Sequence, residues 1–264
     1  MTIPRRTALT SAAALIASPW LSRPGAAQTG GFALAPSLDL DWAVHMDPVL
    51  GANVTQDANG VTLKAAPYVY SGDADLLARS SVVIWSRTAW SGDFKVSFEF
   101  TRLDNTTKTT GTGIGAMLYF HATGAGTEDH PASFAEWPSA RPSEDDYTQY
   151  GRGIRITWSN YNSVTPGNSN EMRLRSFEFT TAYPAKIGAD SPAKFPFKRG
   201  VKYKMTFVRK GNKFSASVKD TTTGRSQSVS WSSTQIGRFS SGYFGIRHQP
   251  GREARYEKFS VTQP

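Results

Sequence analysis

Apolar and polar residues alternate with a period of two along most of this chain, which is the pattern of half-buried β-strands. Between residues 94 and 101, for example, aromatic and aliphatic residues alternate with Lys, Ser, Glu and Thr. The same pattern recurs in the runs 114–121, 201–207, 214–218, 243–247 and 256–261. The period of 3.6 residues that marks amphipathic helices is almost absent. The chain is therefore predicted to be all-β, a two-sheet antiparallel β-sandwich of the jelly-roll type.

Two runs near the middle of the chain each combine an apolar face with a polar face that carries arginine. In residues 154–158, Ile and Trp point one way and Arg155 points the other. In the next run, Met172 and Leu174 oppose Arg173 and Arg175. The arginines converge only if the two strands are neighbours with matching register, because a slip of one residue turns a side chain to the other face. A sheet face of this kind suits an anionic or hydroxyl-rich ligand.

The first 27 residues have the pattern of an export signal. Arg5 and Arg6 precede an apolar run that is too short to span a bilayer, and small residues lead to Ala27. The arginine pair partly matches a twin-arginine signal, and an ordinary Sec signal remains open. We therefore expect residues 28–264 to form one domain in the periplasm or outside the cell. The chain contains no cysteine, so its stability depends on its core rather than on disulfides.

The charge of the chain favours anionic partners. The full chain carries a net charge of +9, and removal of the three arginines of the predicted signal leaves +6. No basic run, zinc-ligand spacing or RNA-binding motif is visible, so nucleic acid is not the expected partner. We expect a polysaccharide or oligosaccharide partner, no membrane anchor and a monomer. A surface that is merely basic remains the alternative.

Two long insertions interrupt the strands, at residues 122–148 and 180–199. Insertions of this length in a compact domain are usually functional or mobile. The first contains Trp137, which we expect to serve as a platform for a sugar ring. Trp158 shares the parity of two isoleucines and is expected in the core.

The candidate catalytic residues follow from the chemistry of elimination from a uronate. Arginine neutralises the sugar carboxylate, and histidine or tyrosine transfers protons. The residues assigned to these roles are His121, Tyr150 and Arg173. The residues expected to bind substrate are Trp137, Tyr147, Arg152, Arg155, Tyr161, Glu171, Arg175 and His248. The alternative is that the arginines only pair with Glu171 or Glu178 on a solvated face, and that His121 is an ordinary residue at a strand end.

Metal and cofactor sites are not expected from the sequence. The four histidines lack the spacing of a transition-metal site, and residues 144–146 lack the ligand spacing of a known calcium loop. A structural calcium ion held by loop oxygens stays open. A hydrolase would need two carboxylates about 5–10 Å apart, a distance that the sequence does not place.

The strand pattern between about residues 40 and 262 resembles a known superfamily. The segments that carry the resemblance are 93–100, 119–121, 150–153, 171–175, 245–247 and 256–259. They are similar to the concanavalin A-like lectin/glucanase superfamily. The nearest branch is an uncharacterised family associated with rhamnogalacturonan-degrading lyases, and the 3-keto-disaccharide hydrolase family is a weaker match. The resemblance implies a jelly roll with a glycan cleft on one sheet. The catalytic signatures of jelly-roll glucanases and alginate lyases are absent, so no catalytic role is transferred.

Two functions follow from these observations. The first is an exported enzyme, a lyase or hydrolase, that cleaves an acidic or plant-derived polysaccharide. The alternative is a carbohydrate-binding module or lectin without catalysis. An enzyme needs a titratable group with a perturbed pKa in a deep cleft, whereas a lectin needs only aromatic and polar contacts on a shallow face.

Overall fold

The structure is a computed structural model that describes residues 42–67, 73–105, 115–137, 144–159, 172–180, 183–189 and 197–264. The predicted export signal lies outside these ranges and stays a prediction. None of the helices in the described ranges is long and apolar enough to cross a membrane.

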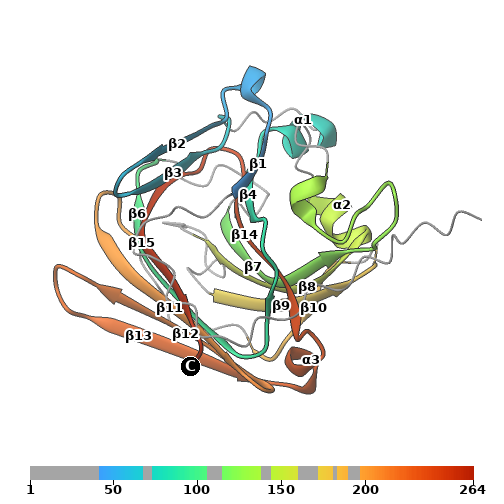
Figure 1. Cartoon of the computed structure of the whole chain (residues 1–264). Helices are drawn as coiled ribbons and strands as arrows, with labels where there is room; N and C mark the ends of the chain where they lie inside the picture. The colour runs from blue at the N-terminus through green and yellow to red at the C-terminus, as the bar shows by residue number, and fades with distance from the viewer. Residues whose placement is uncertain are drawn as a thin grey trace, which may run out of the picture.

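The described strands form two antiparallel sheets, which confirms the predicted fold class (Figure 1). Sheet A has the order β1 (Trp42–Met46), β4 (Val82–Ser86), β14 (Ser241–His248), β7 (Gly115–Gly124), β8 (Gly151–Ser159), β9 (Met172–Glu178) and β10 (Ala185–Lys186), and β5 (Trp90–Ser91) pairs with β14. Sheet B has the order β13 (Ser226–Ser232), β12 (Lys213–Asp220), β11 (Lys202–Lys210), β6 (Phe94–Arg102), β15 (Glu253–Thr262), β3 (Gly60–Lys64) and β2 (Asn53–Asp57).

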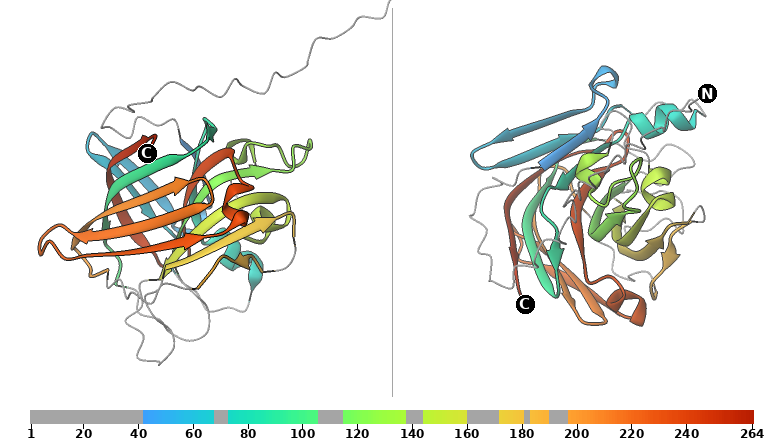
Figure 2. Two further views of the ribbon diagram at one scale, coloured as in Figure 1. Left: turned by 90° about the horizontal axis from the view of Figure 1, so that it is seen from below. Right: turned by 45° about the vertical axis from the view of Figure 1, so that its right-hand side comes forward.

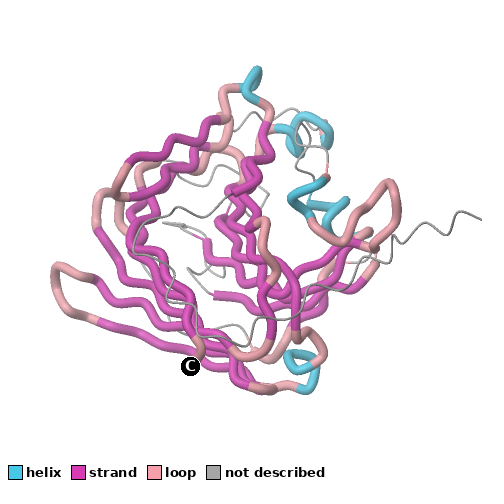
Figure 3. The backbone as a smooth tube through the Cα atoms, in the orientation of Figure 1, coloured by secondary structure: helices cyan, strands magenta, loops and turns pink. Residues whose placement is uncertain are grey.

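Helices are few and short, as Figure 3 shows. They are η1 (Pro48–Leu50), α1 (Ala74–Arg79), η2 (Phe134–Glu136), α2 (Glu144–Gln149) and α3 (Thr234–Gly237). α1 and α2 lie on the side of sheet A that faces away from sheet B (Figures 1 and 2).

The main core lies between the two sheets and is built by the predicted alternation. In β6, every second residue from Phe94 to Phe100 is buried against sheet A. Phe94 stacks on Phe120 of β7 with ring centroids 5.1 Å apart. Trp158 of β8 is also in this core, where its parity with two isoleucines predicted it to lie.

A second apolar cluster covers the outer face of sheet A, and the first insertion builds much of it. Residues 122–124 continue β7, and the described remainder of the insertion includes η2 and α2 rather than only loop. Phe134 and Tyr147 pack against Trp85 of β4 with ring centroids 4.5 and 5.4 Å apart. The insertion is therefore an integral layer on sheet A.

A β-bulge in β7 changes which way His121 points. The register with β8 shifts between Phe120 and Thr123, and His121 takes a positive φ of 48°. Phe120 faces the main core, and Ala122 belongs to the cluster on the outer face. His121 contacts sheet B and Phe239 instead of the arginines of the outer face: its ring lies 5.1 Å from that of Phe94, and its Nδ1 bonds with the carbonyl of Phe239. Simple alternation would place His121 on the same face as Tyr119, but the extra residue of the bulge turns it to the other side.

Glycines on both neighbouring strands accommodate this bulge. A Cβ at Gly153 of β8 would lie 2.8 Å from Cα of Ala122. A Cβ at Gly242 of β14 would meet the backbone of His121 even more closely. Both glycines also have positive φ, 155° and 148°, which residues with a side chain rarely adopt.

Three histidines are buried in the structure, where they form hydrogen bonds and carry no charge. His45 bonds through Nδ1 with the Tyr147 hydroxyl at 2.7 Å, and His121 Nδ1 donates to the carbonyl of Phe239 at 2.8 Å. His248 Nε2 bonds with the Tyr256 hydroxyl at 2.6 Å. Burial lowers the pKa of each of these histidines to about 4. All three are therefore uncharged at neutral pH.

Replacing Gly242 by Ala should lower the free energy of unfolding by about 3 kcal/mol. Alanine is strained at this positive φ, and its methyl group would clash with the His121 backbone. Gly224→Ala is the matched control: its φ is also positive, at 74°, but no atom lies within 4 Å of the new Cβ. This control should lose only about 1 kcal/mol. Urea unfolding measures both, and equal losses would show that the bulge does not depend on Gly242.

Stability should fall as the pH drops from 6.5 towards 4. The unfolded histidines bind protons near pH 6.5, whereas the folded ones resist protonation until about pH 4. The contribution of these neutral histidines to the free energy of unfolding is therefore complete above pH 6.5 and is lost on acidification. The loss is at most about 3 kcal/mol per histidine. Urea unfolding at pH 7 and pH 4.5 measures the loss, which should be smaller in His45→Gln. Unchanged stability across this interval would contradict the neutral assignment.

Candidate functional site

Strand register brings three of the predicted arginines to the outer face of sheet A. Arg155 of β8 lies directly opposite Arg175 of β9, and Thr157 lies opposite Arg173. Tyr119 of β7 continues the first row on the other side of Arg155. The strands are thus neighbours with the register that convergence requires, and the placement of these arginines agrees with the alternation in the sequence.

Arg155 is buried on this face by α2. Its Nη1 donates to Glu144 Oε1, and Gln249 Nε2 donates to the other carboxylate oxygen at 3.0 Å. Burial pushes the pKa of Glu144 upwards, but the charges of Arg155 and Arg247 and these hydrogen bonds outweigh it and hold the pKa below its usual value. Glu144 is therefore an ionised partner of the arginines at neutral pH.

Several donors at this position lack an acceptor among the described residues. Arg155 Nε and Nη2 and Arg175 Nε are buried without a hydrogen-bond partner there. Arg175 Nη1 donates to the carbonyl of Pro184 at 3.3 Å, which is a long hydrogen bond. Unsatisfied donors of buried cations are costly, so they mark positions that an additional acceptor would stabilise.

An exposed tyrosine lies over the arginines. The Tyr183 ring centroid is 4.7 Å from Cζ of Arg175 and 5.5 Å from Cζ of Arg155. Tyr183 is 70 % exposed, although residues this apolar are usually better covered. We call Arg155, Arg173, Arg175 and Tyr183 the arginine–tyrosine patch. It combines cationic hydrogen-bond donors with an accessible aromatic ring, and these two features suit the recognition of a polar, ring-shaped ligand.

The aromatic residues of the first insertion are not on this accessible surface. Trp137 is only 7 % exposed, and its Nε1 donates to the carbonyl of Pro131 at 2.8 Å. Its predicted role as a platform facing solvent is therefore wrong. Tyr147 is buried, and its hydroxyl forms a hydrogen bond with His45. Burial raises the pKa of this hydroxyl. Tyr150 is half-buried and stacks on His130 with ring centroids 3.8 Å apart.

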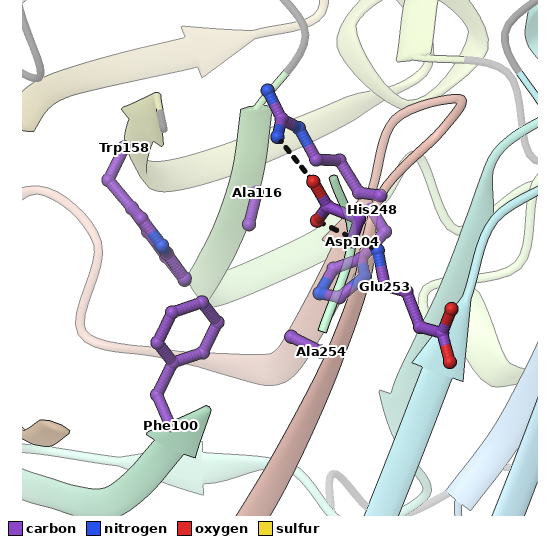
Figure 4. Close-up of a pocket in the computed structure, with 8 residues that line it drawn as sticks. Phe100, Asp104, Ala116, Trp158, His248, Glu253 and Ala254 are labelled. Carbon is purple, nitrogen blue, oxygen red and sulfur yellow. Dashed lines mark hydrogen bonds and ion pairs between the residues drawn. The ribbon is translucent and has the colours of Figure 1, made fainter. Parts of the chain in front are cut away.

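The predicted histidines lie away from the patch. His121 is turned by the bulge towards Phe239, so it is not placed as a base beside the arginines. His248 points between the sheets, where it lines a cavity with Asp104 and Trp158 (Figure 4). This cavity has a volume of about 10 Å³, which accommodates about one water molecule and no sugar. The assignment of His248 to a glycan-binding face is therefore wrong.

The remaining predicted residues have different outcomes. Arg152 is half-buried at the end of β8 that is remote from Arg173, opposite Glu178. Tyr161 and Glu171 lie outside the described residues, so their roles stay predictions. Within the described ranges, no three His, Asp or Glu side chains come together as a metal site. The structural calcium that the sequence left open has no support there.

Sequence reasoning missed Tyr183 and the role of Glu144. Tyr183 lies in an insertion without strand periodicity, and nothing in its local sequence shows that it reaches over β9. In the sequence, Glu144 is one of several carboxylates that a hydrolase could use, and nothing there marks it as the partner of Arg155. The signal that could have identified it is an unpaired Arg155 on an otherwise covered face, which requires a carboxylate nearby.

Comparisons with known proteins identify the fold. No protein-family model matches the chain, and no curated protein matches it by sequence. A Bacillus subtilis protein of unknown function with a galectin-like fold has 16 % identity and a TM-score of 0.53, covering 84 % of this chain and 89 % of that one. Lectin II from Ulex europaeus has 11 % identity and a TM-score of 0.53, covering 88 % and 97 %.

A third similar structure is the exoplasmic/lumenal domain of VIP36 in its Ca²⁺/Man2-bound form. It has 13 % identity and a TM-score of 0.53, and the match covers 84 % of this chain and 88 % of that chain. Identities this low establish the fold alone. The predicted association with rhamnogalacturonan-degrading lyases has no match among these proteins and stays a prediction. The chain has the fold of the galectins and legume lectins, the concanavalin A-like architecture that its strand pattern resembles.

Proposed function

We propose that the protein binds a carbohydrate at the arginine–tyrosine patch on the outer face of sheet A. The observation that carries this proposal is the exposed Tyr183 ring, which lies over two arginines with unused donors. The patch does not need to form a deep cleft, since a lectin-type contact can be shallow. The bound sugar is an oligosaccharide or part of a polysaccharide.

The patch offers partners both to the apolar face of a sugar ring and to the oxygen atoms at its edge. One face of the Tyr183 ring covers the arginines, and the exposed part of the ring is available to the C–H face of a pyranose. The guanidinium groups of Arg173 and Arg175 donate hydrogen bonds to oxygen atoms at the ring edge. Similar folds in complex with galactose and with mannose oligosaccharides add support, because they present carbohydrate on the same architecture.

Cleavage of an acidic or plant-derived glycan is the second candidate, and the site supports it less well. Of the three residues assigned to catalysis, only Arg173 is on the patch. A two-carboxylate hydrolase needs a protonated acid. Glu144 cannot supply that proton at neutral pH, because its arginine neighbours lower its pKa. Binding without turnover is therefore the function that we favour.

The setting of this activity is also part of the proposal. We propose that residues 28–264 form a single exported domain that acts in the periplasm or outside the cell, as a monomer. The pattern of residues 1–27 supports this setting.

Tyr183→Ala should weaken glycan binding about tenfold or more, because it removes the stacking surface, which is worth on the order of 1.4 kcal/mol. Tyr183→Phe keeps the ring and should retain most of the affinity. Isothermal titration with the best ligand from a glycan array of neutral and acidic oligosaccharides measures both. The matched control is Thr222→Ala, an exposed change at the turn between β12 and β13. Absence of any ligand on the array, or unchanged binding by Tyr183→Ala, would refute the proposal.

The purified protein should release no products from polysaccharides. Incubation with a panel of pectic, alginate and β-glucan substrates should give neither new reducing ends nor the ultraviolet absorbance of unsaturated sugars. Glu144→Gln tests the same point, because it should change stability through the loss of its pairing with Arg155 rather than change a turnover rate. Product formation that Glu144→Gln abolishes in a folded protein would establish the enzyme instead.

A further inference from the structure

Two exposed aromatic residues lie on one short connection at the edge of sheet A. In the described ranges, the exposed large hydrophobic side chains are those of Val49, Phe179 and Tyr183. Phe179 directly follows β9, and Tyr183 comes two residues before β10, so both belong to the segment that joins the last two strands of the sheet (Figure 1). Single exposed hydrophobic residues are common on proteins, but two on one short connection are not scattered and point to a binding role.

Phe179 also has a backbone conformation that disfavours a bulky side chain. Its φ is +44°, in the left-handed region that glycine and asparagine adopt more readily than phenylalanine. The other non-glycine residues with positive φ in the described ranges, His121 and Lys258, lie where register shifts mark β-bulges. The pairing of β8 with β9 has no such shift. A bulge therefore does not account for the strain at Phe179, and strain of this kind concentrates at functional sites.

Backbone hydrogen bonds fix the position of Phe179. Its N–H donates to the carbonyl of Gly151 at 2.8 Å, and the N–H of Thr180 donates to the carbonyl of Thr148 at 3.2 Å. The two acceptors lie at the start of β8 and in α2, so the end of the first insertion holds this backbone in place. The Phe179 ring is 47 % exposed on this fixed backbone. A ligand that packs on it does not have to order the chain first, which lowers the entropic cost of binding.

The spacing of the two aromatic residues suits a ligand longer than one sugar ring. Tyr183 lies over Arg175, and Arg175 precedes Phe179 by four residues. The Cα atoms of Arg175 and Phe179 are therefore roughly 13 Å apart, at ~3.3 Å per residue of extended strand. A ligand that covers the Tyr183 ring has to extend along β9 to reach Phe179. This arrangement suits consecutive units of an oligosaccharide better than a monosaccharide.

We infer that Phe179 is a second aromatic contact of the carbohydrate site, and that the bound sugar is an oligosaccharide whose units pack on both Tyr183 and Phe179. This inference rests on the proposed carbohydrate-binding function, to which it adds a binding residue and a minimum ligand length. The apolar C–H faces of two sugar units lie on the two exposed rings. The sugar chain between them runs along β9, past the half-buried Arg175.

Oligosaccharides of increasing length test this inference. The probes are manno-, galacto-, cello- and galacturono-oligosaccharides, each from the monosaccharide to the hexasaccharide, and isothermal titration measures their affinities. In a series that binds, affinity should rise about tenfold with length until both rings are covered, which is the effect expected of one further stacking contact. Affinity should then stay level as the chain becomes longer.

Variants of Phe179 separate the role of its ring from that of its backbone. Phe179→Leu keeps an apolar side chain without a ring, and should abolish the gain with length while the shortest probe that binds keeps its affinity. Phe179→Asn should abolish the gain as well, but its midpoint of thermal unfolding should rise by about 2–4 °C, because asparagine relieves the strain at this φ. Tyr183→Ala should weaken binding at every length.

The matched control is Val49→Ala, which shortens another exposed hydrophobic side chain. Val49 lies in η1, next to β1 at the opposite edge of sheet A, so this variant should keep the wild-type affinity for every probe. A purely structural role of the Phe179 ring would instead lower the unfolding midpoint of Phe179→Asn and leave the gain with length intact.

The outcomes distinguish the inference from the proposed function. Equal affinity for the shortest and the longest probes that bind overturns the inference, and so does a gain with length that persists in Phe179→Leu and Phe179→Asn. In either case the proposed function stands if Tyr183→Ala still weakens binding. Failure of the protein to bind any probe or any sugar on the array overturns the inference and the proposed function together.

Discussion

The contact between Arg155 and Glu144 is the interaction on which the outer side of this molecule depends. A guanidinium on the middle of a covered sheet face cannot remain unpaired, because an isolated buried charge is far too costly. Glu144 at the start of α2 meets that requirement, and α2 in turn places Tyr147 against Trp85. The apolar layer and the ion pair thus support each other. Removing either partner would leave a charge in a poorly hydrated place, so the insertion behaves as part of the sandwich and not as a loose loop.

The sandwich and the outward direction of the arginines could both be predicted from the sequence, because both follow from the alternation of apolar and polar residues with a period of two. Arg155, Arg173 and Arg175 point outwards as alternation requires, and Trp158 is in the core. His121 shows where this reasoning fails. One extra residue in β7 reverses the parity at that position, and only the three-dimensional setting of Gly153 and Gly242 shows that the neighbouring strands make room for it.

Residues in the insertions were harder to predict for a different physical reason. Trp137 and Tyr183 both lie outside regular strands, so no periodicity indicates whether each is covered. Trp137 becomes buried because η2 and Tyr147 pack around it, whereas Tyr183 remains exposed because its described neighbours lie only beneath it. Their exposures follow from tertiary contacts between segments distant in sequence, so the sequence predicted an accessible Trp137 and gave no indication for Tyr183.

The layer built by the first insertion also limits how a long polymer can approach. η2 contacts β1 and β4, and α2 contacts β8 and β9, so the described part of the insertion covers stretches of the outer face of sheet A from its β1 edge as far as β9. A polysaccharide cannot lie straight across all the strands of this sheet. Among the described residues the proposed patch is accessible at Tyr183, near β10, so a bound chain would run parallel to that edge or present its terminus there. If the patch binds sugar as proposed, the number of consecutive sugar units in contact is limited by this layer, and short oligosaccharides should occupy the site about as fully as long ones.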